Sequence, residues 1–505
     1  MVNRNPLRHV HVRRSPLSTL LCLPVIVWGL TFGLQSRATQ QTLEHKIDHL
    51  ITVYQEKANI PGLALAVTQA DRILHLKGYG QAISGQPVTP QTQFLVGSLS
   101  KSFTAIAVLQ LAEAGRLDLD KPVQVYLPEF RLADPHRAAQ ITIRQLLNQV
   151  SGLSDLGFPE LQLSQAGSIG DRITELQHAH TVQAADTEFH YCNLNYDILA
   201  RLVEVVSQQP FAAYLKQHIF EPLRMANTLS VTTSAEALRQ APQLAQGHFM
   251  AFGIPVTSDE MPGYLGGSSG TISTATDMAH YMLFQQNGKH ATSPALLFQE
   301  SLTLTHTPPA KIDSPYGMGW FTEIENHQAA LEHNGILSTF YSKVILLPHS
   351  GYGIVLLYNV SGLPLIALTS PQLEHDLMAL LAGQTPTMNG ASLNSLWAIA
   401  LGLCTVTGLG LAIRSLLYLP QWQHRIGRTS LWRIGLGTGW TFLPAMFFVA
   451  SPWLLASVSD RFFGYALLLR AMPEIMIWLA VCAGLGILNG TIRIILLAQA
   501  GRLSH

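Results

Sequence analysis

Apolar and polar positions are arranged differently in three parts of the chain, and each arrangement predicts a different structure. Four arginines precede an uncharged apolar run at 17–34. Residues 41–383 mix short amphipathic and apolar segments of the lengths found in globular domains. Three long apolar stretches follow, at about 393–413, 434–456 and 474–492. We therefore predict a membrane-directed segment at 1–38, a globular domain, a linker at 384–392 and a helical membrane segment at 393–497.

Each of the three C-terminal stretches is close to the length of ~20 residues that crosses a bilayer as a helix. The connection between the first two is basic and contains no acid; its arginines are Arg414, Arg425, Arg428 and Arg433. Positively charged loops stay in the cytoplasm, which predicts an extracytoplasmic globular domain and a cytoplasmic tail at 498–505. Residues 1–38 are a signal peptide or a retained anchor, and the sequence leaves this choice open.

The globular part shows strand pairs near both of its ends. Apolar runs flank a turn at Ala70 and Asp71, and a second such pair flanks the turn at 349–351. An amphipathic stretch at 43–57 and a closing stretch at 368–383 have helical periodicity. We predict an α+β fold in which an antiparallel sheet gathers strands from both ends of the domain, flanked by helices, with a mostly helical and loop region between.

Composition narrows the classes of partner. The chain has 31 basic and 31 acidic residues, only 12% charged residues and 48% hydrophobic ones. This balance gives no support to nucleic-acid binding and agrees with contact with a lipid bilayer. The 20 histidines include His178, His180 and His190, but no metal-ligand spacing such as H-E-x-x-H occurs, so we expect no metal and no cofactor.

The sharpest chemical feature is Ser98 followed by Lys101 in the apolar stretch GSLSKSFTAIAVLQL. Residues three apart lie on the same face of a helix, and an uncharged lysine can remove the proton of a serine hydroxyl. The plain alternative is a capping serine with an exposed lysine. A second serine motif, G-x-S-x-G around Ser268, lacks the preceding strand that a nucleophile elbow needs, so we interpret it as a loop.

Two further motifs make the serine–lysine pair credible. Tyr191 and Asn193 precede an apolar helix, where a phenol can relay a proton and an amide can bind a substrate carbonyl. His333 and Gly335 lie beside a predicted strand; glycine allows a substrate to approach closely, and the amide of Ile336 can stabilise an oxyanion. Taken singly, the first motif is also compatible with a loop tyrosine and a helix cap, and the second with a solvent-facing hairpin histidine.

The order S-x-x-K, Y-x-N and H-x-G resembles that of the serine β-lactamase and penicillin-binding protein superfamily, particularly the class C β-lactamase-like hydrolases. The resemblance extends to LLNQVSGL at 146–153, GGSSGTISTATDMAHYM at 266–282 and YGMGW at 316–320. It covers the globular part and not the helices after it. It implies the β-lactamase/transpeptidase-like fold and an acyl-enzyme mechanism.

The resemblance also implies a role for each motif residue. Ser98 would carry the acyl group and Lys101 would be its base, while Tyr191 would assist proton transfer. Asn193 would hold the substrate amide, and the amides of Ser98 and Ile336 would form the oxyanion hole. His333 stands where the family's K-T-G motif has lysine, so weaker recognition of substrate carboxylates is expected.

We therefore predict a membrane-anchored serine hydrolase that acts on amide or ester bonds of the cell envelope, of D-alanyl peptidase or esterase type. A β-lactamase, or a silent penicillin- or peptidoglycan-binding sensor on the same scaffold, is the alternative. Its expected partners are a small-molecule, peptide or ester substrate and the lipid bilayer. The sequence leaves both protein partners and oligomeric state open.

Overall fold

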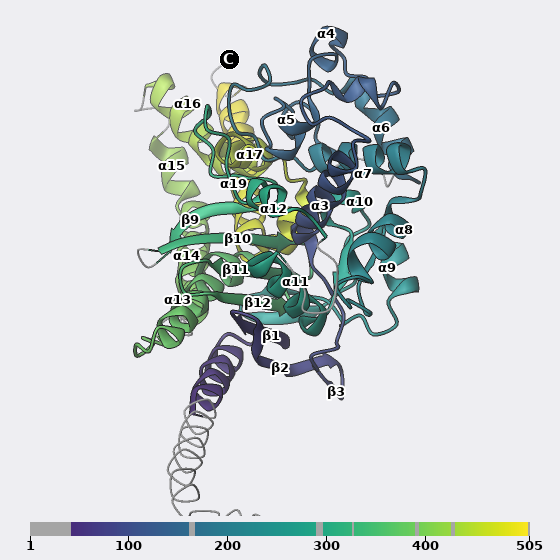
Figure 1. The fold of residues 1–505 in the computed structure, drawn as a ribbon. Coiled ribbons are helices and arrows are strands. Elements are labelled where there is room, and N and C mark those ends of the chain that lie inside the picture. The colour runs from purple at the N-terminus through teal and green to yellow at the C-terminus, as the bar shows by residue number, and fades with distance from the viewer. Residues whose placement is uncertain are drawn as a thin grey trace, which may run out of the picture.

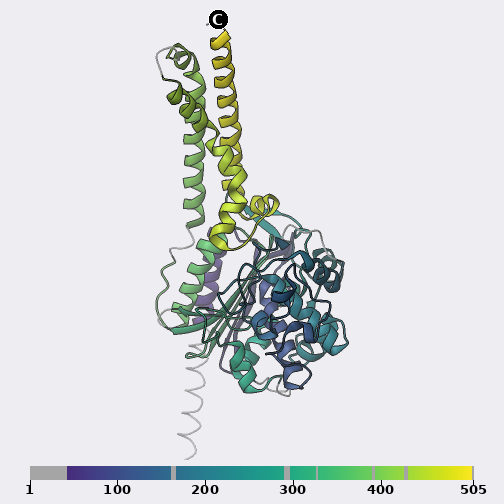
Figure 2. The same ribbon diagram turned by 90° about the horizontal axis from the view of Figure 1, so that it is seen from above.

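The computed structural model describes residues 42–160, 167–288, 296–325, 328–388, 393–425 and 430–502. The predicted signal or anchor at 1–38 lies outside the described residues, as does part of the predicted linker. A globular body contains the residues up to 388, and long helices leave it beyond residue 393 (Figures 1 and 2).

A seven-stranded antiparallel sheet forms the centre of the globular body (Figure 1). Its strand order is β3-β2-β1-β12-β11-β10-β9. The strands are β1 (Gly62–Gln69), β2 (Arg72–Ile83), β3 (Gln86–Pro87), β9 (Phe321–Glu325), β10 (Gln328–Ile336), β11 (Tyr341–Leu347) and β12 (Tyr352–Tyr358). The first and last strands are neighbours, with Leu63 opposite Tyr358 and Gln69 opposite Tyr352. The prediction of a sheet assembled from both ends of the domain is confirmed.

Alternation of side chains along β1 explains why both faces of the sheet are covered. Leu63, Leu65 and Val67 point to one apolar cluster, which includes the helix at 42–57 and α13 (Ser370–Leu381). Ala64 and Ala66 point to the other cluster, which includes α3 (Ser100–Glu113) and α11 (Ala275–Asn287). Because successive strand residues face opposite sides, one strand serves both cores.

A helical region packs beside the second face of the sheet (Figure 1). Its other helices are α4 (Pro135–Ala138), α5 (Ile143–Leu147), α6 (Ile169–Glu175), α7 (Asn193–Ser207), α8 (Phe211–Leu215), α9 (Ser234–Gln240), α10 (Gly266–Ser269) and α12 (Gln299–Thr305). Thr274 caps α11, since its hydroxyl oxygen accepts a hydrogen bond from the amide of Asp277 at 3.1 Å.

Short strands also occur in this middle region, which we predicted to be mostly helix and loop. A three-stranded sheet has the order β4-β8-β5, and a separate hairpin joins β6 to β7. These strands are β4 (Phe94–Leu95), β5 (Leu229–Ser230), β6 (His248–Ala251), β7 (Ile254–Thr257) and β8 (Thr271–Ser273). Segments of two to four residues are too short for alternation to be read from the sequence.

The C-terminal part is mostly helical in its described residues, with a non-helical connection at 460–464. Its helices are α14 (Leu393–Leu417), α15 (Leu419–Arg425), α16 (Leu431–Gly439), α17 (Leu443–Ser459), α18 (Tyr465–Ala471) and α19 (Pro473–Arg502). Among the described residues, three segments are long and apolar enough to cross a membrane: Ile399–Leu417, Trp432–Ser459 and Pro473–Gln499. Figure 2 shows the first and last of these helices extending side by side away from the globular body.

The predicted linker begins with an anchored stretch. The backbone amides of Thr387 and Met388 each donate to the carboxylate of Asp376 on α13, at 2.9 Å. Tyr54, from the helix at 42–57, donates to the same carboxylate at 2.6 Å. The carboxylate of Asp376 therefore fixes the path of the chain before it enters the C-terminal helices.

Candidate active site

Ser98 lies in a single turn of 3-10 helix, Gly97–Leu99, which leads directly into α3. Almost every residue of α3 is buried, including Lys101, which has no exposed surface. Ser98 itself is partly exposed. The alternative of an exposed lysine on a surface helix is therefore wrong, because α3 runs through the core.

Three oxygen atoms surround the Lys101 amine. Its Nζ lies 3.0 Å from Oγ of Ser98, 2.8 Å from Oδ1 of Asn193 and 2.9 Å from the carbonyl oxygen of Ser268. The last two oxygens can only accept hydrogen bonds, whereas the hydroxyl can also donate. The two carbonyl oxygens orient the amine, and the hydroxyl of Ser98 is the one group of the three whose proton an uncharged amine can accept.

Tyr191 and Asn193 reach the same place from the start of α7. The Nζ of Lys101 lies 4.9 Å from the centroid of the Tyr191 ring, and Asn193 is the first residue of the helix. The Tyr191 ring also stacks on Phe321 of β9, with 6.1 Å between centroids. This packing limits the motion of the phenol beside the amine.

His333 lies on β10 and is buried, at 1% exposure, with its ring centroid 6.0 Å from that of Tyr191. Burial, reinforced by the charge of Lys101, lowers the pKa of His333 to about 3. The neutral ring donates from Nδ1 to the carbonyl oxygen of Asn334 at 2.6 Å. Its Nε2 then accepts from the hydroxyl of Tyr316 at 3.2 Å. No positive charge is present on this side chain at neutral pH.

Gly335 allows β10 to lie against the turn that holds Ser98. A Cβ atom at Gly335 would meet the carbonyl oxygen of Val96 at 2.0 Å, far inside van der Waals contact. From the other side, a Cβ atom at Gly97 would lie 3.2 Å from the amide nitrogen of Ile336. The backbone of Ile336 is thus adjacent to the Ser98 turn, where an oxyanion site requires an amide.

The structure brings six of the seven predicted site residues into one continuous arrangement of contacts around Lys101 and the Ser98 turn, namely Ser98, Lys101, Tyr191, Asn193, His333 and Gly335. The seventh, Ile336, contributes its backbone, since its side chain is 48% exposed.

Two residues that sequence reasoning did not assign also shape the site. Ser268 offers its carbonyl to Lys101, while its hydroxyl donates to the carbonyl oxygen of Leu265 at 3.1 Å. Gln149 is buried, and its Oε1 accepts from the amide of Cys192 at 3.0 Å and from the side chain of Asn195 at 2.5 Å. Gln149 therefore fixes the start of α7, and with it Tyr191 and Asn193.

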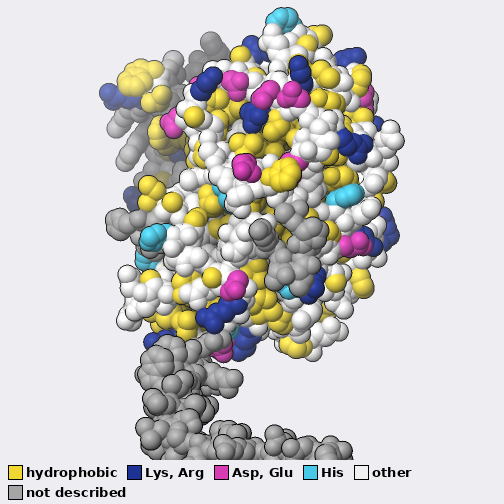
Figure 3. Space-filling view, viewed as in Figure 1, with side chains coloured by type: hydrophobic (Ala, Val, Ile, Leu, Met, Phe, Trp, Pro, Cys, Tyr) yellow, Lys and Arg dark blue, Asp and Glu magenta, His cyan; other side chains and the backbone are white. Residues whose placement is uncertain are grey.

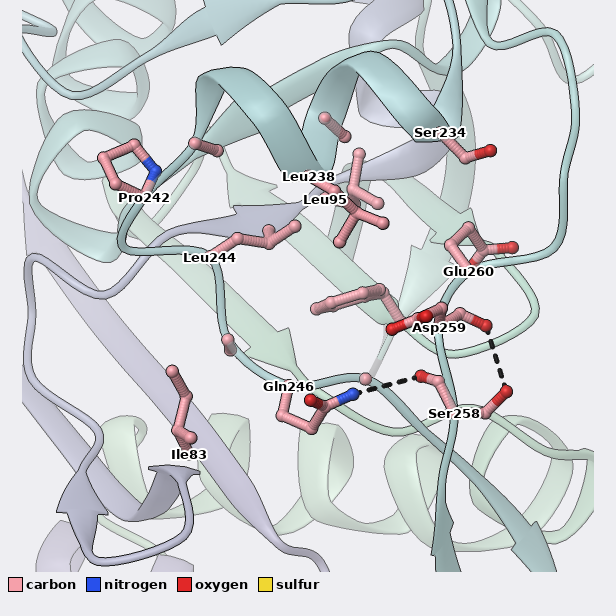
Figure 4. Close-up of a pocket in the computed structure, with 15 residues that line it drawn as sticks. Ile83, Leu95, Ser234, Leu238, Pro242, Leu244, Gln246, Ser258, Asp259 and Glu260 are labelled. Atoms are coloured by element: carbon pink, nitrogen blue, oxygen red, sulfur yellow. Dashed lines mark hydrogen bonds between the residues drawn. The ribbon is translucent and has the colours of Figure 1, made fainter.

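A separate hollow of about 210 Å³ lies between α9, Gln246 and Glu260 (Figure 4). None of the seven predicted site residues is part of its lining. Glu260 instead accepts hydrogen bonds from the amides of Ser338 and Thr339, both at 2.9 Å. On the face shown in Figure 3, basic and acidic side chains lie intermingled. Within the described ranges, no group of three or more histidine, cysteine or acidic side chains is placed to hold a metal ion.

Comparison with known proteins places this geometry in a family. Residues 47–374 match the family model described as Beta-lactamase. Protein flp of Staphylococcus aureus (strain MW2) is 28% identical over 396 residues, which cover 77% of this chain and 77% of that protein. Penicillin-binding protein 4 of Amycolatopsis lactamdurans is 30% identical over 318 residues, covering 60% of this chain and 81% of that protein.

A solved structure gives the same result for the fold. The octameric penicillin-binding protein homologue from Pyrococcus abyssi superposes with a TM-score of 0.58 at 22% sequence identity. The match covers 68% of this chain and 78% of that one. The predicted β-lactamase/transpeptidase-like fold is confirmed.

Proposed function

The chain belongs to the Beta-lactamase family and is a serine hydrolase, and from this premise we propose that it is a membrane-anchored acyl-transfer enzyme whose nucleophile is Ser98. The observation that carries the proposal is the surroundings of the Lys101 amine, within 3.0 Å of the Ser98 hydroxyl and bonded to two carbonyl oxygens. A base needs this combination of contact with the nucleophile and orientation by fixed acceptors.

The proposed reaction has two steps. In the first, Oγ of Ser98 bonds to the substrate carbonyl carbon while its proton passes to Nζ of Lys101. The bond to the leaving amine or alcohol breaks, and Tyr191 relays a proton from Lys101 to that group. The amides of Ser98 and Ile336 hold the oxyanion. In the second step, water attacks the acyl–serine ester by the reverse proton path and frees Ser98.

We infer that the substrate is a D-alanyl peptide or an ester of the cell envelope. The neutral state of His333 supports an ester over a β-lactam or a peptide with a free C-terminal carboxylate, because a fixed cation for that carboxylate is missing at this position. The relative from Amycolatopsis lactamdurans is named as a penicillin-binding protein, which agrees with acylation at a site of this type.

A substrate panel tests the proposed function. Full-length protein in detergent is incubated with a D-alanyl-D-alanine peptide, a p-nitrophenyl ester and nitrocefin, with Ser98→Ala as the control. Turnover of the peptide or the ester, lost in the control, is the expected result. Preferential hydrolysis of nitrocefin would instead identify a β-lactamase, and noncovalent binding without turnover would identify a sensor.

We also propose that the hydrolase body lies outside the cytoplasm. Two observations support this arrangement. The basic connection that follows α14 is at the end of that helix far from the globular body. The connection between α17 and α19 contacts the globular body, as the bond from Arg470 Nη1 to the Asp259 carbonyl at 2.9 Å illustrates. A chain that crosses the membrane three times changes side at each crossing, which would place these two connections on opposite sides of the membrane.

A further inference from the structure

The connection between the second and third apolar segments docks beside the candidate active site. The helix α17 ends at Ser459 and is followed by Asp460, whose Oδ1 accepts from the hydroxyl of Ser154 at 3.2 Å. The other carboxylate oxygen of Asp460 pairs with Nδ1 of His190. Because His190 immediately precedes Tyr191, this contact brings residue 461 to the entrance of α7.

Arg461 extends from this connection into a buried acidic site. Its Nε lies 3.1 Å from Oδ2 of Asp155, and its Nη2 lies 3.7 Å from Oε1 of Glu160. The side chains of Asp155 and Glu160 are only 0% and 7% exposed. Two buried carboxyl groups without a cation are costly, so the globular body has a built site for a guanidinium.

The site for Arg461 adjoins the proposed catalytic groups on two sides. Its guanidinium carbon lies 5.3 Å from the centroid of the Tyr191 ring, the same ring that Lys101 approaches. Glu160, the second carboxyl partner, also interacts with the side chain of Asn193, which lowers the pKa of the Glu160 carboxyl against the rise that burial causes. Asn193 in turn accepts from Lys101 at 2.8 Å. Contacts therefore run without interruption from Arg461 to the base of the reaction.

The two acids bind only part of the Arg461 guanidinium. Among the described residues, Nη1 of Arg461 has no hydrogen-bond partner, while Nε and Nη2 face the two acids. The side chain of Arg461 is 21% exposed, so it lies beside Tyr191 near the protein surface and not in the core. A planar, permanently charged group in this position can hold an aromatic ring and a carboxylate at once.

We propose that Arg461, supplied by the membrane segment, is a positioning residue of the active site that holds Tyr191 and, through Glu160, Asn193 in the arrangement needed for acylation of Ser98. This inference rests on the proposed function. It makes the hydrolase body dependent on the membrane segment for full activity, although every proposed catalytic residue lies in the globular body.

Full-length variants in detergent test this role with a p-nitrophenyl ester. We expect Arg461→Gln to lower kcat by roughly tenfold to a hundredfold, the cost of a small misplacement of catalytic groups, with little change in KM. Arg461→Lys, which keeps the charge, recovers part of the loss. The matched control is Arg470→Gln: Arg470 binds the same body through Asp259 and Ser338 but does not contact Tyr191, and this variant keeps the wild-type rate.

Other outcomes separate the inference from the proposed function. Should wild type react at Ser98 and Arg461→Gln react equally fast, the positioning role is wrong and the proposed function stands. Equal losses of kcat in Arg461→Gln and Arg470→Gln would also overturn the positioning role, because the cause would then be weaker attachment of the C-terminal part to the globular body. If the wild-type protein forms no acyl-enzyme, both the positioning role and the proposed function are wrong. If Arg461→Gln fails to fold, the double variant Asp155→Asn/Arg461→Gln is used, because it also removes one of the two carboxylates left without a cation. Recovery of the wild-type kcat in the double variant would contradict the positioning role of Arg461.

Discussion

At the scale of single residues, the account depends on the chemical difference between the three oxygens around Lys101. Two are carbonyl oxygens, from Asn193 and Ser268, and one is the hydroxyl of Ser98. The carbonyl oxygens orient the amine, and the hydroxyl is the one group of the three whose proton an uncharged amine can accept. The amine itself is fully buried, whereas Ser98 is partly exposed.

Replacement of Lys101 by methionine tests its assignment as the base. We expect Lys101→Met to slow acylation of Ser98 by roughly a hundredfold to ten-thousandfold, the usual range for general-base catalysis. The measurement is the rate of covalent labelling by a fluorophosphonate. Lys57→Met is the matched control, since Lys57 is exposed on the helix at 42–57. Equal labelling rates for Lys101→Met and wild type would contradict the assignment.

The neutral state of His333 has a consequence for stability at acid pH. The pKa of a histidine is 6.5 in the unfolded chain, and burial lowers that of His333 to about 3 in the fold. Below pH 6.5 the unfolded chain therefore binds a proton that the folded chain refuses. Stability falls as the pH falls from 6.5 toward 3, by about 1.4 kcal/mol per pH unit for this group.

The comparison of wild type with His333→Asn isolates this effect. The difference in apparent unfolding free energy between the two proteins should change across pH 4–6.5, with wild type losing more toward acid, and should be constant above pH 7. Buried His306, whose pKa burial also lowers, to about 4, remains in both proteins and cancels. A difference that is independent of pH would mean that the fold does not shift the pKa of His333.

The contact of Ser98 with Lys101 could be predicted because it depends only on spacing within a helix. The carbonyl of Ser268 and the amide of Gln149 could not, because they reach the site through tertiary packing. Ser268 lies in the short helix α10 and not in the loop that we predicted, and Gln149 lies in a turn. The G-x-S-x-G motif draws attention to the hydroxyl of Ser268 as a candidate nucleophile. In the structure, the backbone carbonyl of Ser268 contacts Lys101 instead. The bonds of Gln149 to the start of α7 likewise cannot be read from the sequence.

At the scale of elements, the site exists because β10 lies against the turn that begins α3. Gly335 makes this approach possible, since any side chain would collide with the Val96 carbonyl and with Oγ of Ser342, at 2.0 and 2.4 Å. The antiparallel sheet could be predicted from the two hairpin patterns at the domain ends. The distance between β10 and the turn could not, because no periodicity encodes how closely two elements pack.

A single added methyl group tests this packing. We expect Gly335→Ala to lose about 1–3 kcal/mol of stability through overpacking and to slow acylation more than tenfold, because the Ile336 amide moves away from Ser98. Thermal unfolding and labelling kinetics measure the two effects. Gly263→Ala is the control, since the nearest atom to its added Cβ is 3.6 Å away. Unchanged kinetics in Gly335→Ala would remove Ile336 from the oxyanion site.

At the scale of the whole molecule, the hydrolase body and the apolar helices form one connected structure. The apolar segments could be predicted from length and composition alone. The docking of the connection after α17 could not, because Arg461 has no sequence motif and its acids, Asp155 and Glu160, are 300 residues earlier in the chain. Long-range ion pairs of this kind become visible only in three dimensions.

The proposed orientation in the membrane predicts which side of the bilayer each connection faces. In a cysteine-free background expressed in bacterial cells, a membrane-impermeant maleimide should label Ser350→Cys in intact cells. It should label His424→Cys only after the membrane is opened. Both positions are exposed in the structure, so access depends on the side of the membrane. Labelling of His424→Cys in intact cells would contradict the proposed orientation.

The most direct test of the central claim is to map the covalent adduct that a fluorophosphonate forms with the full-length protein. Peptide mass spectrometry should place the adduct on Ser98 in wild type and find none in Ser98→Ala. An adduct on another serine, such as Ser268, or one that persists in Ser98→Ala, would contradict the assignment of Ser98 as the nucleophile.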